Sequence, residues 1–143
     1  MTTVRREGMT DAATAALRLF TDAVTIAYGN RLEGLVVFGS RARGEATENS
    51  DLDVAVILND ETIDRYRERM ALADIAYDAI VETGIHVQPW PVTAAEWREP
   101  ERAVNPAVVR AMQRDGRRVE AAGACGPANR GAQVRRSRAT GCP

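Results

Sequence analysis

The order of apolar and polar residues along the chain predicts helices and short strands in alternation. Residues 10–28 carry apolar side chains at steps of three and four, which is the spacing of one helical face. Thr10 has the residue type of an N-cap, and Gly29 has that of a stop, so we expect a helix between them. Its apolar face comprises Ala13, Leu17, Phe20, Val24 and Tyr28.

Two strands are predicted next. The run "LVVF" (35–38) is short, continuously apolar and followed by Gly39, which is typical of a strand that is buried on both faces. In "DLDVAVIL" (51–58) alternate side chains share a face, so Asp51 and Asp53 point the same way. Two carboxylates cannot belong to the core, so the start of this strand must reach the surface.

A second long helix is predicted over 60–83. Asn59 or Asp60 is its expected cap, and Gly84 is its expected end. Apolar residues recur there at steps of three and four, and we expect this stripe to cover the sheet. The stripe comprises Ile63, Tyr66, Met70, Ala73, Tyr77 and Ile80.

Three further elements complete the pattern. "IHVQPWPV" (85–92) predicts a strand near a sheet edge, because its two prolines cannot donate ladder hydrogen bonds. A capping-box pattern at 93–96 opens a short helix, and residues 105–116 have the N-cap, first-turn proline and closing glycine of a last helix. We assign Trp90 and Trp97 to the core rather than to stacking on a nucleotide base.

The order helix, strand, strand, helix, strand, helix predicts an α/β (α+β) fold, in which a small mixed sheet is flanked by helices. The 143 residues fit one domain, which we place at 1–120. Residues 121–143 are rich in Gly, Ala and Arg and have no periodicity, so we expect a disordered tail.

Composition and charge exclude several classes of protein. All 19 basic residues are Arg, and with 20 acidic residues the net charge is −1, which gives no general reason for binding to nucleic acid or membranes. The apolar runs are too short to span a membrane, and the N-terminus lacks the core of a signal peptide, so we expect a cytoplasmic protein. Both cysteines lie in the tail without a partner at metal-ligand spacing, so no zinc site is predicted.

The segment "GSRARGEATENSDLD" (39–53) has the residues of a phosphate site. A glycine directly after a buried strand lets the backbone turn sharply and approach a ligand closely, as Gly39 would. Ser40 would open a short helix and offer a hydroxyl and backbone N–H groups to a phosphate. Arg41 and Arg43 could neutralise triphosphate oxygens.

The same segment ends on a candidate metal site. Asp51 and Asp53 lie on one face, so their carboxylates can share hard cations such as Mg2+. A Gly-Ser turn alone is usually only a turn, and an Asp-x-Asp pair alone usually lies in solvent without a function. Together, at a spacing of ten residues, they indicate nucleotidyl transfer assisted by two metal ions.

This segment resembles the signature of the minimal nucleotidyltransferases in the DNA polymerase β superfamily, and the resemblance extends over about residues 10–118. The residues that match its usual form are Gly39, Ser40, Arg41, Ala42, Arg43, Gly44, Ser50, Asp51 and Asp53. The resemblance implies a mixed-sheet core, Mg2+ on both aspartates, and an NTP such as ATP with its triphosphate on Ser40. We therefore expect nucleotide binding by Gly39, Ser40, Arg41, Arg43 and Ser50.

The resemblance also implies a partner protein. Family members of this length are often antitoxins encoded beside a helical HEPN-type toxin, and the better understood ones transfer AMP from ATP to a tyrosine of that toxin. We therefore expect an antitoxin that can form a hetero-oligomer. Transfer to a small molecule, as in relatives that modify aminoglycosides, is disfavoured because the chain has no room for the additional substrate-binding domain.

One feature of the family pattern is missing. The family supplies a third carboxylate from a later strand, but residues 85–92 contain neither Asp nor Glu, and His86 or Gln88 stands in that place. His86 could be a general base or a metal ligand, which makes it a catalytic candidate with Asp51 and Asp53. Alternatively, it is a partly buried polar residue with a satisfied hydrogen bond. If no residue, Glu82 included, fills the gap, catalysis would be slow or lost, and the alternative is a degenerate antitoxin that neutralises its partner by binding.

Overall fold

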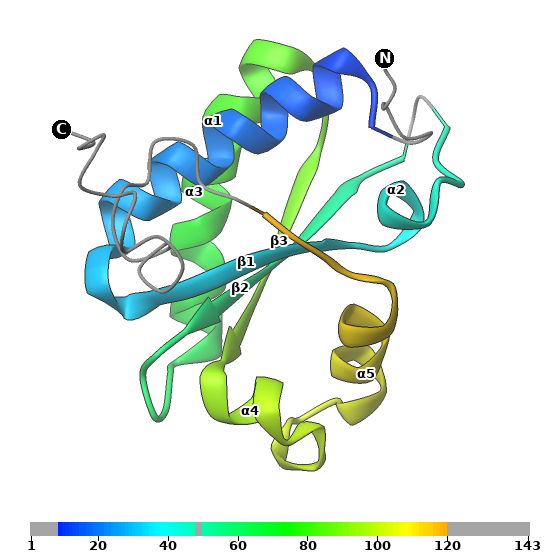
Figure 1. Cartoon of the computed structure of the whole chain (residues 1–143). Coiled ribbons are helices and arrows are strands. Elements are labelled where there is room, and N and C mark those ends of the chain that lie inside the picture. Colours follow the sequence, from blue (N-terminus) through cyan, green and yellow to red (C-terminus); the bar gives the residue numbers. More distant parts are fainter. Residues whose placement is uncertain (1–8, 48–49, 120–143) are drawn as a thin grey trace, which may run out of the picture.

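The computed structural model describes residues 9–47 and 50–119, which form a four-stranded mixed sheet between two layers of helices (Figure 1). The strands are β1 (Leu32–Phe38), β2 (Leu52–Leu58), β3 (Val87–Thr93) and β4 (Arg117–Arg118). Their order is β3-β2-β1-β4, with β1 antiparallel to both β2 and β4 and with β2 parallel to β3. The expected α/β class with a mixed sheet is confirmed, whereas the predicted tail at 121–143 lies outside the described residues.

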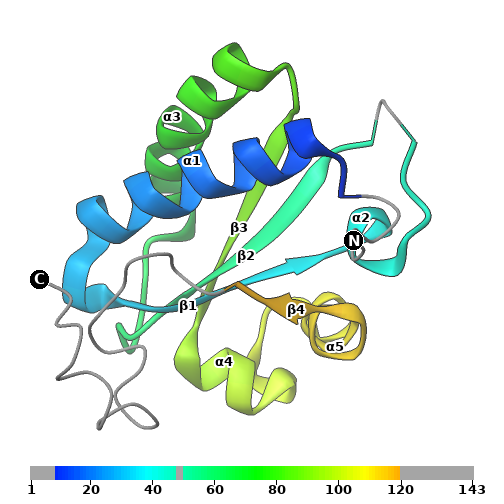
Figure 2. The same ribbon diagram turned by 45° about the horizontal axis from the view of Figure 1, so that its top comes forward.

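The helices cover both faces of this sheet, as Figure 2 shows from a second side. They are α1 (Asp11–Tyr28), α2 (Ser40–Arg43), α3 (Arg65–Thr83), α4 (Ala94–Arg98) and α5 (Pro106–Asp115), with 3-10 turns η1 (Gly29–Arg31) and η2 (Pro100–Arg102). Helices α1 and α3 lie on one face, α4 and α5 lie on the other, and α2 follows the end of β1. Within the described ranges, no helix combines the length and the apolar character needed to cross a membrane.

Three of the predicted helix caps are confirmed. The Thr10 hydroxyl accepts a hydrogen bond from the backbone N–H of Ala13 over 3.1 Å. Thr93 and Glu96 form a reciprocal capping box at the start of α4. Asn105 caps α5, whose first residue is proline. These local signals fix where helices begin, because each satisfies an N–H group that has no partner within the helix.

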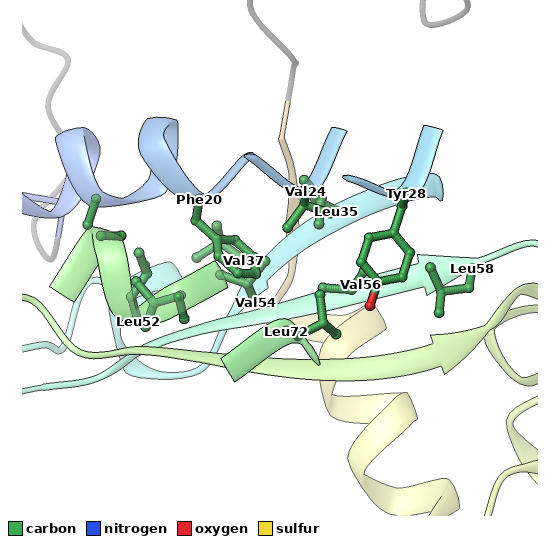
Figure 3. Close-up of a cluster of buried hydrophobic side chains, with 14 of the residues drawn as sticks. Phe20, Val24, Tyr28, Leu35, Val37, Leu52, Val54, Val56, Leu58 and Leu72 are labelled. Carbon is green, nitrogen blue, oxygen red and sulfur yellow. The ribbon is translucent and has the colours of Figure 1, made fainter. Parts of the chain in front are cut away.

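The alternation in β2 divides the core in two. Leu52, Val54, Val56 and Leu58 are fully buried against α1 and α3 (Figure 3). The other face of the sheet packs with α4 and α5 in a smaller cluster. Each fully buried aliphatic side chain contributes roughly 1.5–3 kcal/mol. Asp53 lies on the face of the smaller cluster, at the end of the sheet where that cluster stops.

Helix α3 differs from its prediction in two respects. It begins at Arg65 with Asp64 as its cap, not at Asn59 or Asp60. Most of the predicted core stripe is also wrong, because the buried residues of α3 are Leu72, Ala76 and Ala79, although Ile63, which precedes the helix, packs against the core. The small alanines allow α3 to pack closely between α1 and β3, and this close approach rotates the larger apolar side chains outward.

The sheet has two different edges. β3 is an edge strand, as its prolines predicted, and the Pro91 carbonyl accepts a hydrogen bond from Nη1 of Arg65 over 2.9 Å. β4 was not predicted, because two consecutive arginines have no apolar pattern. Its Arg118 side chain lies against Gly34 of β1, where a Cβ atom would overlap the guanidinium. A short charged strand of this kind protects a sheet edge from pairing with another chain.

Candidate active site

The candidate site begins where β1 ends. Gly39 has φ +80° and ψ −161°, a conformation that is open essentially only to glycine. Its carbonyl accepts hydrogen bonds from the N–H groups of Ala42 and Arg43, both over 3.1 Å, which closes α2. Ser40 is the first residue of this short helix and is half-buried.

The carboxylate of Asp53 lies directly against this turn. A Cβ atom on residue 39 would overlap Oδ2 of Asp53, so the missing side chain of Gly39 is what admits the carboxylate. Antiparallel pairing sets Asp53 opposite Phe38, the last residue of β1. The Gly-Ser turn and the Asp-x-Asp pair, ten residues apart in the chain, therefore meet in one place.

The two aspartates differ in their surroundings. Asp51 is exposed and precedes β2 by one residue, whereas Asp53 is half-buried. Burial raises the pKa of Asp53 above its usual value, and the charge of Asp51 adds to the rise. The hydrogen bond from Trp90 and the charge of Arg43 partly oppose it. Two neighbouring carboxylates that repel each other can share a hard cation, which would relieve the repulsion.

His86 lies beside the aspartate pair. Its Nδ1 atom is 3.5 Å from Oδ1 of Asp51, and both side chains are exposed. The backbone supports this placement, because the His86 carbonyl accepts a hydrogen bond from the N–H of Leu52 over 2.8 Å. The alternative of a partly buried histidine is wrong, because the His86 side chain is exposed at the surface.

Gln88 stands in the position that faces Asp53 from the next strand. Parallel pairing of β2 and β3 sets Asp53 opposite Gln88, so the two side chains share a face. An amide cannot replace a carboxylate as a proton acceptor. Across residues 9–47 and 50–119, no group of three or more His, Cys, Asp or Glu side chains is arranged to hold a metal ion.

Trp90 is a further member of the site. Its indole N–H donates a hydrogen bond to Oδ1 of Asp53 over 3.5 Å. The ring packs edge to face on Phe38, with centroids 6.0 Å apart, and the Arg69 guanidinium lies 5.3 Å from its centroid. The assignment of Trp90 to the core missed this contact, although the period of two in "HVQPW" puts His86, Gln88 and Trp90 on one face.

The two arginines of α2 have different environments. Arg41 is only 2% exposed, and its Nη2 atom donates to the carbonyls of Ser50, over 3.0 Å, and Thr47, over 3.4 Å. It therefore ties α2 to the loop that leads into β2. Arg43 is exposed and forms salt bridges with Glu45 and Asp115, at 2.9 and 3.4 Å. Of the two, Arg43 is the one placed to meet a ligand from solvent.

Ser50 contributes to the same loop. Its hydroxyl accepts a hydrogen bond from the backbone N–H of Thr47 over 2.9 Å. Its carbonyl accepts from Arg41, so both ends of the residue help to fix the approach to Asp51. Of the residues predicted for the site, Gly39, Asp51, Asp53 and His86 come together, while Arg41 and Ser50 shape the loop beside them.

Comparison with known proteins agrees with this geometry. The family described as a nucleotidyltransferase domain matches residues 27–110, which include the whole site. The chain belongs to this nucleotidyltransferase family, and the expected class of enzyme is confirmed.

Two relatives from Methanocaldococcus jannaschii share part of the sequence, and each bears the name "Putative protein adenylyltransferase". The first is 32% identical over 71 residues, which are 48% of this chain and 71% of the relative. The second is 37% identical over 62 residues, which are 43% of this chain and 42% of the relative. The chain thus spans less than half of the second relative.

Two solved structures resemble the fold at a greater distance. One is a toxin-antitoxin structure with AMP-PNP, at 18% identity and a TM-score of 0.49, over 71% of this chain and 70% of that one. The other is a nucleotidyltransferase from Sulfolobus solfataricus, named there as putative, at 19% identity and a TM-score of 0.45, over 76% of this chain and 86% of that one. These distant likenesses say nothing of the substrate or partner of this chain.

Proposed function

We propose that the chain is a Mg2+-dependent adenylyltransferase that moves AMP from ATP to a hydroxyl group of a partner protein. The observation that carries the proposal is the meeting of Asp51 and Asp53 with the Gly39 turn, in a chain of the nucleotidyltransferase family. The domain that performs this function is the segment 1–120. No contact with nucleic acid or a membrane forms part of the proposal.

The two aspartates fit a bound Mg2+ ion. In nucleotide sites this ion is typically held by one or two carboxylates, with substrate phosphates and water filling the remaining positions. Asp51 and Asp53 offer such a pair, and a bound cation would offset the electrostatic repulsion between their two carboxylates. When bound, Mg2+ would neutralise phosphate charge and acidify the attacking hydroxyl.

The turn and its arginines would hold the nucleotide. Gly39 brings the backbone close to a ligand, and Ser40 offers its hydroxyl at the start of α2. Arg43 would exchange its exposed salt bridges for bonds to phosphate oxygens. Arg41 and Ser50 act indirectly in this proposal, because their hydrogen bonds fix the loop.

His86 would act as the general base. The acceptor oxygen attacks the α-phosphorus of ATP, the bond to the β-phosphate oxygen breaks, and pyrophosphate leaves. The proton of the hydroxyl passes to the neutral imidazole, which the contact between Nδ1 and Asp51 helps to orient. Gln88 cannot take this role because an amide does not accept a proton at neutral pH.

The acceptor is a protein in this proposal because both named relatives are described as protein adenylyltransferases. The more specific proposal is that the acceptor is a HEPN-type toxin and that this chain is its antitoxin. It rests on the resemblance of the segment 39–53 to the minimal nucleotidyltransferases.

A second candidate function follows from Gln88. Since this residue stands opposite Asp53 and the described residues hold no third acidic ligand, the chain could instead be a catalytically degenerate antitoxin. Such a protein would neutralise its partner by binding. Complex formation would then be indifferent to Asp51 and Asp53.

The deciding experiment incubates the chain with Mg2+ and α-labelled ATP, with and without the product of any adjacent gene. We expect label on that protein with the wild-type chain, and none with Asp53→Asn. Asp22→Asn, which removes an exposed carboxylate on α1, is the matched control and should retain transfer. Complex formation without any label would favour the degenerate antitoxin.

A further inference from the structure

The outer face of α3 carries large apolar side chains that the fold leaves in solvent. Tyr66 is 71% exposed, Met70 48%, Tyr77 62% and Val81 63%. Steps of four, seven and four residues place them on one side of the helix, with Ala73 between them. We call this set, Tyr66, Met70, Ala73, Tyr77 and Val81, the α3 stripe. Contiguous apolar patches of this kind on a folded domain mark interaction sites more often than chance.

The sequence itself shows that the α3 stripe is not incidental. Its spacing is regular enough that the pattern alone predicts a core-facing helix, yet the core uses Leu72, Ala76 and Ala79 instead. Helix α3 therefore has two apolar faces, and the sheet covers only one. A helix that is apolar on both sides is expected to have a partner on each.

The α3 stripe approaches the candidate active site at one point. A cavity of about 230 Å3 lies beside it, between α3 and the edge of the sheet. From α3 it is lined by Arg69, Ala73 and Ile80, and from the start of β3 by His86 and Gln88. His86 also contacts Asp51, so the cavity adjoins both Ala73 of the stripe and a direct neighbour of the aspartate pair. Figure 2 shows the C-terminal end of α3 next to the start of β3.

A row of carboxylates borders the α3 stripe. Asp74, Asp78 and Glu82 follow Ala73, Tyr77 and Val81 by one residue each, so they run parallel to it along the helix. All three are exposed, and within residues 9–47 and 50–119 none forms a salt bridge. The border is therefore complementary to a partner that carries Lys or Arg beside an apolar centre.

We propose that the α3 stripe is the surface on which the acceptor protein docks, with basic residues of that protein against the carboxylate row. This inference rests on the proposed function, since it supplies the partner of the same site. Docking there would place the acceptor hydroxyl at the cavity of His86 and Gln88. It also explains why the apolar pattern of α3 is strong although the core does not use it.

The test uses the full chain, with the product of any adjacent gene as the probe. The docking variant is Met70→Glu combined with Tyr77→Glu, and both positions are exposed, so the fold should persist. The control is Ile26→Glu, at a position 83% exposed on α1. We expect the docking variant to bind the probe at least about 30-fold more weakly and the control to bind it like the wild type.

Two further measurements separate docking from folding and from catalysis. The affinity for ATP should be the same in all three proteins, because the substitutions lie outside the nucleotide residues. Hydrogen exchange at 66–82 should slow on complex formation. Replacing Asp74 and Asp78 by Arg should lower the association rate about tenfold at low salt and much less at high salt.

The outcomes distinguish this inference from the proposed function. If label reaches the probe equally well from the docking variant, the acceptor uses another surface and the inference is overturned, while the enzyme stands. If the wild-type chain transfers no label but its complex with the probe depends on Met70 and Tyr77, the docking surface stands and the chain is the degenerate antitoxin. Failure of the wild-type chain to bind the probe, or self-association through the α3 stripe, would overturn the inference.

Discussion

The indole N–H of Trp90 donates a hydrogen bond to Oδ1 of Asp53 over 3.5 Å, so the third strand of the chain fixes a carboxylate of the second. The ring of Trp90 is itself held between Phe38 and the Arg69 guanidinium. This arrangement orients Asp53 from the side opposite to Gly39. The position of the Asp53 carboxylate is thus set by β3 and by the turn after β1, in addition to its own strand β2.

Trp90→Phe removes this hydrogen bond and keeps most of the ring. A hydrogen bond of this kind contributes about 0.5–1.5 kcal/mol, so we expect the rate of label transfer to fall roughly two- to tenfold. The bond also lowers the pKa of Asp53, so its loss should move the acidic limb of the rate profile to higher pH. The measurement is the initial rate as a function of pH.

Trp97→Phe is the matched control for this variant. Trp97 packs against the same apolar cluster as Trp90, but within the part of the chain that the structure describes no hydrogen bond joins its side chain to Asp53. It should therefore leave the rate profile unchanged. If both variants shift the profile alike, the effect comes from core packing and not from the bond to Asp53.

Gly39→Ala tests whether the turn admits the carboxylate. Residue 39 has a positive φ, and its new Cβ would overlap Oδ2 of Asp53, so the carboxylate must move. We expect a loss of roughly 1–3 kcal/mol in the free energy of unfolding and a loss of label transfer. Urea unfolding and the transfer assay measure the two effects separately.

Gly29→Ala separates backbone strain from the clash. Gly29 also has a positive φ, of 53°, but a Cβ atom added there would meet open space, with no other described residue beyond its chain neighbours within 4 Å. This substitution should lower stability while leaving transfer intact. Equal loss of transfer in both variants would contradict the proposed role of Gly39.

The sequence predicted elements whose signals are local. Thr10 and the capping box at 93–96 mark helix starts by chemistry that needs no distant partner, and both are confirmed. The period of two in 51–58 likewise placed Asp51 and Asp53 at the surface end of a strand. That the pair meets the Gly39 turn follows from antiparallel pairing of the two strands, which the structure shows.

Features that depend on packing could not be predicted in this way. The predicted apolar stripe of α3 has the period of a core face, and only the fit between α3, α1 and the sheet decides that Leu72 and Ala76 face inward. The burial of Arg41 is similar, because its partners are carbonyls of a loop whose course the residue types do not fix. In both cases the residue types indicate the chemistry of the side chains but not the direction in which they point.

Arg41 and Arg43 should have separable effects. Arg41→Ala removes a buried guanidinium and its hydrogen bonds to the Thr47 and Ser50 carbonyls, so we expect a cost of about 1–3 kcal/mol in the free energy of unfolding. Arg43→Ala, at an exposed position, should leave stability nearly unchanged and weaken ATP binding. Chemical unfolding and titration with ATP provide the two measurements. A pair of variants with the reverse behaviour would show that Arg41 meets the phosphates.

Asp53→Asn should stabilise the protein when Mg2+ is absent. Burial and the charge of Asp51 raise the folded-state pKa of Asp53 above its unfolded value, so the ionised carboxylate lowers stability at neutral pH. Asparagine removes the charge and can still accept the Trp90 hydrogen bond. We expect a gain of about 0.5–2 kcal/mol at pH 7, the range typical of relieving an unfavourable site.

The dependence of this gain on pH gives the strongest test. The difference between Asp53→Asn and the wild type should shrink as the pH falls through the folded-state pKa of Asp53, and it should vanish below the unfolded-state pKa, where both chains carry a neutral side chain. Mg2+ should raise the melting temperature of the wild type but not of the variant, because a ligand stabilises only the state that binds it. Thermal unfolding at pH 4 and pH 7, each with and without Mg2+, covers all four conditions. A variant that is less stable at pH 7, or a gap that persists unchanged at pH 4, would show that Asp53 already has a compensating partner and has no need of a cation.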